Sequence, residues 1–159
     1  KCGYYGCPDK ECSCSASARS QYLSKISGPL LDRIDIQIEV GRLTYDVLRN
    51  DTPSEKSSDI RKRVEKARSR MMSRYAGTGV YANGQLTPAM IREFCRTDEK
   101  ADEVMKAAFD RLGLSARGYD RILKLAKTIA DLDDSDIINS KHIAQAIQLR
   151  SLDRKYWQS

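Results

Sequence analysis

The sequence predicts a mainly α-helical protein, in which a bundle of about four to five helices follows the remnant of an α/β core. Three observations favour this fold class. Apolar residues recur at helical spacing over most of residues 58–149. Capping residues and glycine or proline stops separate these helical segments. One earlier stretch, residues 34–40, alternates apolar and polar side chains and predicts a single edge strand.

Composition and charge limit the classes of function. The 159 residues carry a net charge of +6, and the isoelectric point is near 9.1, which suits an anionic partner such as nucleic acid or a nucleotide. No apolar run approaches the about 20 residues that a membrane span requires, so we expect no membrane partner. The opening K-C-G-Y-Y-G is not typical of a signal peptide, and we expect a cytoplasmic protein. It starts within a cysteine-rich motif and without Met, so we expect a fragment of a longer protein.

The first segment is a turn-rich loop that holds four of the five cysteines, namely Cys2, Cys7, Cys12 and Cys14. Four thiolates in such a loop can close a tetrahedral zinc site. Their spacing, C-x4-C-x4-C-x-C, is not one of the standard zinc patterns, and reduced thiols without metal are the alternative. The loop is therefore a candidate Zn²⁺ site.

The predicted strand carries an arginine at its entrance. A helix that Ser15 or Ser17 can cap is expected over residues 15–26. The β-branched side chains of residues 34–40 then predict a strand with one buried face. Arg33 stands directly before this strand, between Asp32 and Asp35. A rigid strand could present the Arg33 charge to something outside the subunit, whereas the two aspartates could instead neutralise it.

A connector and a basic helix come next. Residues 44–57 read as a linker, because they hold one short helical turn and an N-D-T-P breaker. Residues 58–75 predict a strong helix with lysines and arginines on one face. Arg63, Lys66 and Arg70 are candidate DNA-binding residues, since such a face can lie on a phosphate backbone. The alternative is a basic face that only meets solvent.

Start and stop signals delimit the remaining helices. Thr87 precedes a proline at a first helical position, Asp98 and its neighbours place acid in a first turn, and Gly113 ends that helix. Ser115 is expected to cap the next helix, to about residue 132, and Ser140 the last one.

Arg117 lies in the first turn of the helix that Ser115 caps. A cation there opposes the helix dipole, at a cost of a few tenths of a kcal/mol. A helix N-terminus with a guanidinium suits a phosphate, although a plain surface arginine is the alternative. Cys95 reads as a core residue, and the lone His142 suggests no nucleophile–histidine set.

Two stretches together resemble a known family. They are S-G-P-L-L-D-R-I-D-I-Q-I-E-V, around Arg33, and L-G-L-S-A-R-G-Y-D-R-I-L-K-L-A-K-T-I-A-D-L, around Arg117. The chain resembles the magnesium-chelatase-like AAA+ ATPases, and among them the bacterial competence type, the ComM/YifB family. The tail H-I-A-Q-A-I-Q-L-R-S-L-D-R, C-G-Y-Y-G and E-C-S-C extend the resemblance over nearly the whole chain.

The resemblance implies a domain organisation. Residues 1–43 would be the C-terminal end of an AAA+ core, with the cysteine-rich loop and the strand that follows Arg33. Residues 44–57 would be a linker, and residues 58–159 a helical lid of the magnesium-chelatase C-terminal type.

The resemblance also implies roles and partners. Arg33 falls on the arginine finger, which reaches the ATP of a neighbouring subunit, and Arg117 falls on the sensor 2 arginine. The implied parent is a homo-hexamer that uses ATP and Mg²⁺ as a DNA helicase in branch migration of incoming DNA. No G-x-x-x-x-G-K-[ST] occurs in the chain. We therefore expect the Walker motifs upstream of Lys1, and no ATP hydrolysis by this chain alone.

Two other classes of function stay open. A chelatase-type subunit would use the same ATP cycle to remodel a protein or metal-insertion partner. A free-standing helical module would instead be a stable monomer with a partner of its own.

Overall fold

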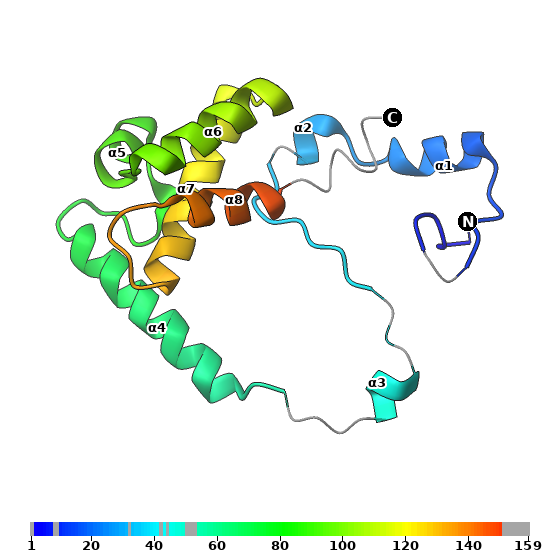
Figure 1. Cartoon of the computed structure of the whole chain (residues 1–159), viewed down its shortest axis with the longest axis horizontal. Helices are drawn as coiled ribbons and strands as arrows, with labels where there is room; N and C mark the ends of the chain where they lie inside the picture. Colours follow the sequence, from blue (N-terminus) through cyan, green and yellow to red (C-terminus); the bar gives the residue numbers. More distant parts are fainter. Residues whose placement is uncertain are drawn as a thin grey trace.

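The structure is a computed structural model that describes residues 2–7, 10–31, 33–41, 43, 45–49 and 54–150. Its described part is mainly helical, which confirms the predicted fold class. The helices are α1 (Ala16–Leu23), α2 (Gly28–Leu31), α3 (Tyr45–Arg49), α4 (Ser57–Arg74), the 3-10 helix η1 (Asn83–Gln85), α5 (Pro88–Phe94), α6 (Glu99–Leu112), α7 (Ala116–Leu132) and α8 (Ser140–Gln148). Helices α4 to α8 form one bundle, whereas α1 and α3 lie away from it (Figure 1).

Side-chain caps fix the helix starts as the sequence predicts. The hydroxyl groups of Ser15, Thr87 and Ser115 each accept a hydrogen bond from the amide three residues on, at 3.2, 3.4 and 3.0 Å. Asp98 caps α6 in the same way, at 2.7 Å. Gly113 ends α6 at a φ of 54°, in the left-handed region that favours glycine.

The cap of α8 differs from the prediction by one residue. Asn139, not Ser140, has the extended backbone of an N-cap, and its side chain accepts from the amides of Lys141 and His142 at 3.0 and 3.2 Å. The Asn139 amide in turn donates to Nδ1 of His142 at 3.1 Å. His142 thus lies in the cap turn, and it is also buried.

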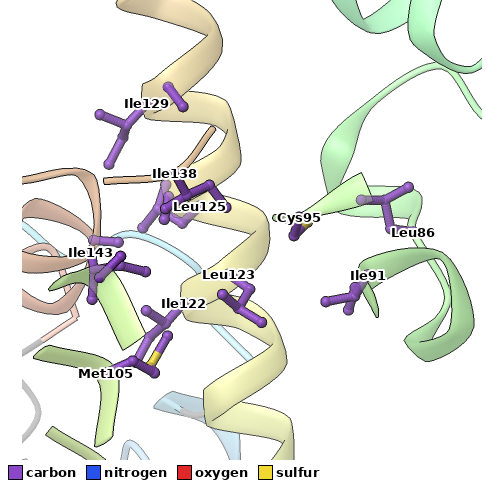
Figure 2. Close-up of a cluster of buried hydrophobic side chains, with 14 of the residues drawn as sticks. Leu86, Ile91, Cys95, Met105, Ile122, Leu123, Leu125, Ile129, Ile138 and Ile143 are labelled. Atoms are coloured by element: carbon purple, nitrogen blue, oxygen red, sulfur yellow. The ribbon is translucent and has the colours of Figure 1, made fainter. Parts of the chain in front are cut away.

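Helix α7 forms the centre of the hydrophobic core. It packs against α4, α5, η1 and α8. Figure 2 shows its side chain Leu123 facing the side of Ile91 and Cys95, and Ile122 facing Met105. Burial raises the pKa of the Cys95 thiol to about 11, so Cys95 is a core residue, as predicted.

The buried carboxylate of Asp131 in α7 joins three elements. Both terminal nitrogens of Arg74, from α4, donate to it, and Nδ2 of Asn83, from η1, donates at 2.9 Å. Lys127 lies one turn earlier, with Nζ 3.8 Å from a carboxylate oxygen. The hydroxyl of Tyr75 donates to Oδ1 of Asn83 at 2.6 Å. Because buried charges are costly unless they are paired, this cluster sets how α4 and η1 sit on α7.

The first half of α4 extends past the bundle (Figure 1). Ile60 and Val64 belong to the apolar stripe that predicted this helix, but their side chains are exposed. Ala67, Met71 and Tyr75 continue the stripe and are buried. Only the second half of α4 therefore contributes to the core.

The predicted edge strand does not form. In the described chain residues 34–40 have no strand structure, and Val40 at their end is 83% exposed. A backbone hydrogen bond from the Gln37 amide to the Leu149 carbonyl, at 2.7 Å, holds the segment. Alternating apolar and polar side chains are typical of a segment that can join a β-sheet. A strand also needs a neighbouring strand for its backbone hydrogen bonds, and the described residues supply none.

We expect Arg74→Ala to lower the free energy of unfolding by about 3–5 kcal/mol, because it leaves the Asp131 carboxylate buried with a weaker partner set. Chemical denaturation followed by circular dichroism measures this loss. Arg68→Ala, at an exposed position of the same helix, is the control and should change stability by less than about 0.5 kcal/mol. Equal effects of the two changes would contradict the role of Asp131.

Candidate functional site

Arg33 follows α2 and is exposed. One terminal nitrogen of its guanidinium donates to the Pro29 carbonyl at 3.0 Å. Among the described residues no carboxylate forms an ion pair with Arg33, and Asp32 lies outside them. Within the described residues, the Pro29 carbonyl is thus the acceptor that the structure gives for this guanidinium.

Asp35 pairs with the bundle rather than with Arg33. Its carboxylate forms an ion pair with the side chain of Arg121, from the second turn of α7, and lies 3.9 Å from a terminal nitrogen of Arg150. In the structure Asp35 thus does not neutralise the charge of Arg33.

The backbone around Arg33 is fixed to the same part of the bundle. A terminal nitrogen of Arg121 donates to the carbonyl of Arg33 at 2.6 Å, and one of Arg150 donates to the carbonyl of Ile34 at 2.9 Å. With the bond from Gln37 to Leu149, these contacts hold residues 33–37 against α7 and the end of α8.

Arg117 is exposed in the first turn of α7. It lies four residues before Arg121, so both arginines project from one face of the helix. The first turn of a helix also has amide groups without helical partners, and its dipole favours negative charge. The structure therefore brings Arg33 close to the helix end that carries Arg117.

This arrangement suits anionic oxygen ligands. Guanidinium groups bind phosphate or carboxylate oxygens with two parallel hydrogen bonds, which an ammonium group cannot do. Sequence reasoning identified Arg33 and Arg117 but missed Arg121, Arg150 and the pairing of Asp35. The only signal for Arg121 was its place one turn after Arg117.

Three of the four cysteines in the N-terminal loop come together. The sulfur atoms of Cys2, Cys12 and Cys14 all lie within 4.8 Å of one another, whereas Cys7 is not part of this group. A hydrogen bond from the Tyr4 amide to the Cys2 sulfur, and next the hydrogen bond between Cys2 and Cys12, lower the pKa of Cys2 to about 6. The predicted set of four is therefore a set of three in the structure.

The basic face of α4 has acidic partners that sequence reasoning did not assign. Arg63 pairs with Glu55, and Lys66 pairs with Asp134 at 2.7 Å. Arg70 pairs with Asp134 at 2.8 Å and also with an aspartate two residues later. The lysine lowers the pKa of Asp134 through its hydrogen bond. The signal for the partners of Lys66 and Arg70 is the acidic run D-L-D-D-S-D, residues 131–136.

Two family models match this chain. "Magnesium chelatase, subunit ChlI C-terminal" matches residues 54–150, and "Magnesium chelatase, subunit ChlI" matches residues 1–48. The chain therefore belongs to the magnesium chelatase ChlI family, as its two arginine motifs predict.

The chain is also similar in sequence to individual proteins of known name. The chain is 35% identical to the uncharacterized protein YifB of Escherichia coli over 142 residues, which are 89% of this chain and 27% of that protein. It is 37% identical to the competence protein ComM of Haemophilus influenzae over 135 residues, 84% of this chain and 26% of ComM. The chain thus spans about a quarter of the length of these relatives.

The described helices include none with the length and apolar composition that crossing a bilayer requires.

We expect Arg121→Ala to speed hydrogen exchange at the Gln37 amide by up to about fivefold, because an exposed ion pair contributes about 1 kcal/mol at most. Exchange followed by mass spectrometry or NMR measures this. Arg111→Ala, an arginine in the last turn of α6, is the control and should leave the Gln37 amide unchanged. An unchanged rate in Arg121→Ala would mean that this arginine does not hold the segment.

Proposed function

We propose that this chain is the C-terminal part of a hexameric AAA+ ATPase that couples ATP hydrolysis to work on DNA. In this proposal residues 1–43 complete the ATPase core and residues 58–159 form the helical lid. Residues 44–57 link the core to the lid. The arginine finger is Arg33, and the sensor 2 residue is Arg117.

The observation that supports the finger best concerns the described surroundings of Arg33. Its neighbour Asp35 pairs with Arg121, and its backbone is held to α7. A finger requires this combination, because the guanidinium must be unpaired until it meets phosphate while its backbone position stays fixed. In phosphoryl transfer an arginine supplied in trans stabilises the charge that develops on the transferred group.

Arg117 fits the second role for a different reason. It joins a guanidinium to a helix N-terminus, and both favour the phosphates of a bound nucleotide. The described residues that suit ATP are thus cationic, and they would orient its phosphates. The Mg²⁺ ligands and the Walker lysine are expected outside this chain.

The net charge of the chain and the name of one relative support the proposed binding to DNA. The Haemophilus influenzae relative is named a competence protein, and this chain carries a net charge of +6. The side chains of Arg63 and Lys66 are 57% and 64% exposed despite their acidic partners, so both can still approach a phosphate backbone.

We expect Arg33→Ala in the intact protein to lower kcat for ATP by about 10³–10⁵, because the finger contributes to the transition state. Arg33→Lys should not restore the rate, since the planar fork is lost. ATPase kinetics and size-exclusion chromatography measure activity and assembly, with Arg111→Ala as the control. Full activity in an intact hexamer of Arg33→Ala would refute the finger.

Arg117→Ala should instead weaken nucleotide binding. Losing a charge-assisted hydrogen bond costs about 1.5–3 kcal/mol, so we expect the Kd for a nucleotide to rise by about 10- to 100-fold. Titration with a fluorescent ATP analogue measures it. Unchanged affinity and turnover would count against the sensor 2 assignment.

Replacing Arg63, Lys66 and Arg70 by Ala in the intact protein should weaken DNA binding. The salt dependence should become less steep by about 0.9 for each phosphate that the protein no longer neutralises. Fluorescence anisotropy across salt concentrations measures both quantities, and the double variant Arg63→Ala/Lys66→Ala avoids any effect of Arg70 on folding. An unchanged salt slope would remove this DNA site.

A matched variant separates direct DNA contact from a structural role of the same residues. Asp134→Asn combined with Asp136→Asn removes the acids that pair with Lys66 and Arg70. Direct contact requires tighter DNA binding in this variant, because the two cations are then released from these acids. Weaker binding would mean that the ion pairs matter only for the fold.

The family description favours one other function. The matching models describe subunits of magnesium chelatase, which supports a protein-remodelling ATPase of the chelatase type as the alternative. Stimulation of the intact ATPase by DNA distinguishes the two functions. ATPase activity that no DNA stimulates, but that a protein partner does, would favour the chelatase type.

A further inference from the structure

Three thiol groups in the N-terminal loop are positioned like the ligands of one metal ion. The Cys2 sulfur lies 3.4 Å from the Cys12 sulfur and 3.4 Å from the Cys14 sulfur. A disulfide would need about 2.05 Å. Two thiolates on one tetrahedral zinc ion, with Zn–S bonds of about 2.3 Å, lie about 3.8 Å apart. The observed spacing is therefore close to that of zinc ligands and far from that of a disulfide.

The backbone of the loop supports this convergence. Gly3 and Gly6 adopt φ angles of 76° and 79°, which the tight turns after Cys2 require. The Cys2 amide donates to the Cys14 sulfur at 3.3 Å, and the Tyr4 amide donates to the Cys2 sulfur at 3.5 Å. Amide groups that donate to sulfur are the usual outer shell of a thiolate metal site.

Helix α1 holds the loop from outside. A terminal nitrogen of Arg19 donates to the Cys14 carbonyl at 3.2 Å, and its guanidinium lies 5.0 Å from the centre of the Tyr5 ring. Arg19 of α1 thus contacts the loop at Cys14 and at Tyr5. Fixed ligands lose little conformational freedom when a metal binds, which favours binding.

Zinc needs a fourth ligand, and the structure leaves room for one. The three cysteines line a pocket of about 550 Å³, together with side chains that include Tyr5, Arg19 and Tyr22. Cys7 is half-buried in the same loop but lies outside the group of converging sulfurs. Among the described cysteines of the loop, Cys7 is therefore not placed as the fourth ligand.

We propose that Cys2, Cys12 and Cys14 bind one Zn²⁺ ion and supply three of its four ligands, and that Cys7 is not a ligand. Zinc fits better than the alternatives, because three thiolates suit a soft-to-borderline ion and iron–sulfur clusters require four cysteine or equivalent ligands. The ion closes the loop against α1. This site does not depend on the ATPase or DNA roles proposed above.

The test is the metal content of the intact protein, purified without chelators, by inductively coupled plasma mass spectrometry. Cys12→Ser and Cys14→Ser should each contain one zinc ion fewer per chain than the parent. Cys7→Ser, from the same loop, is the matched control and should keep its zinc. None of these cysteines belongs to the bundle core, so thermal unfolding of the helices should stay similar in all variants.

A second measurement tests the ligand set directly. Cobalt(II) in place of zinc should give thiolate-to-cobalt charge transfer and the visible bands of a tetrahedral site, and Cys12→Ser should abolish the charge-transfer intensity of this site. Equal metal content in the parent and Cys12→Ser, loss of zinc in Cys7→Ser, or iron or copper in place of zinc would each overturn the proposal. A disulfide among the three cysteines in protein purified without added oxidant would overturn it as well.

Discussion

The buried carboxylate of Asp131 is the constraint on which the arrangement of the bundle depends. A charge in the core is tolerated only where its partners lie at hydrogen-bonding distance, and here they come from α4 and η1. The apolar side chains fill the space between helices, but the polar geometry fixes which helix faces which. The same helix, α7, carries Arg117 and Arg121 at its other end. One element thus organises both the core and the candidate site.

Local signals predicted the helices well. The caps at Ser15, Thr87 and Ser115 and the stop at Gly113 depend on atoms a few residues apart, so they are legible in the sequence. The strand over residues 34–40 was not predictable in this way, because a strand forms only when another chain segment completes its hydrogen bonds.

The site was predictable in part for the same physical reason. Arg33 and Arg117 stand in long motifs, and their placement at exposed positions agrees with those motifs. The ion pair of Asp35 with Arg121 joins distant parts of the chain, and no periodic pattern in the sequence predicts such a contact. Spacing likewise could not tell that the loop folds Cys2 back onto Cys12 and Cys14 and leaves Cys7 aside.

Arg33 is connected to the bundle in two ways, through the covalent chain and through side-chain contacts. One connection is the chain itself, which leads through α3, and α3 lies away from the bundle (Figure 1). The direct route runs through the side chains of Arg121 and Arg150. A rotation of α7 would therefore reach Arg33 through the side chain of Arg121, which also forms the ion pair with the exposed carboxylate of Asp35. Because dissolved salt screens such contacts, ionic strength would tune how stiffly the arginine follows the helix.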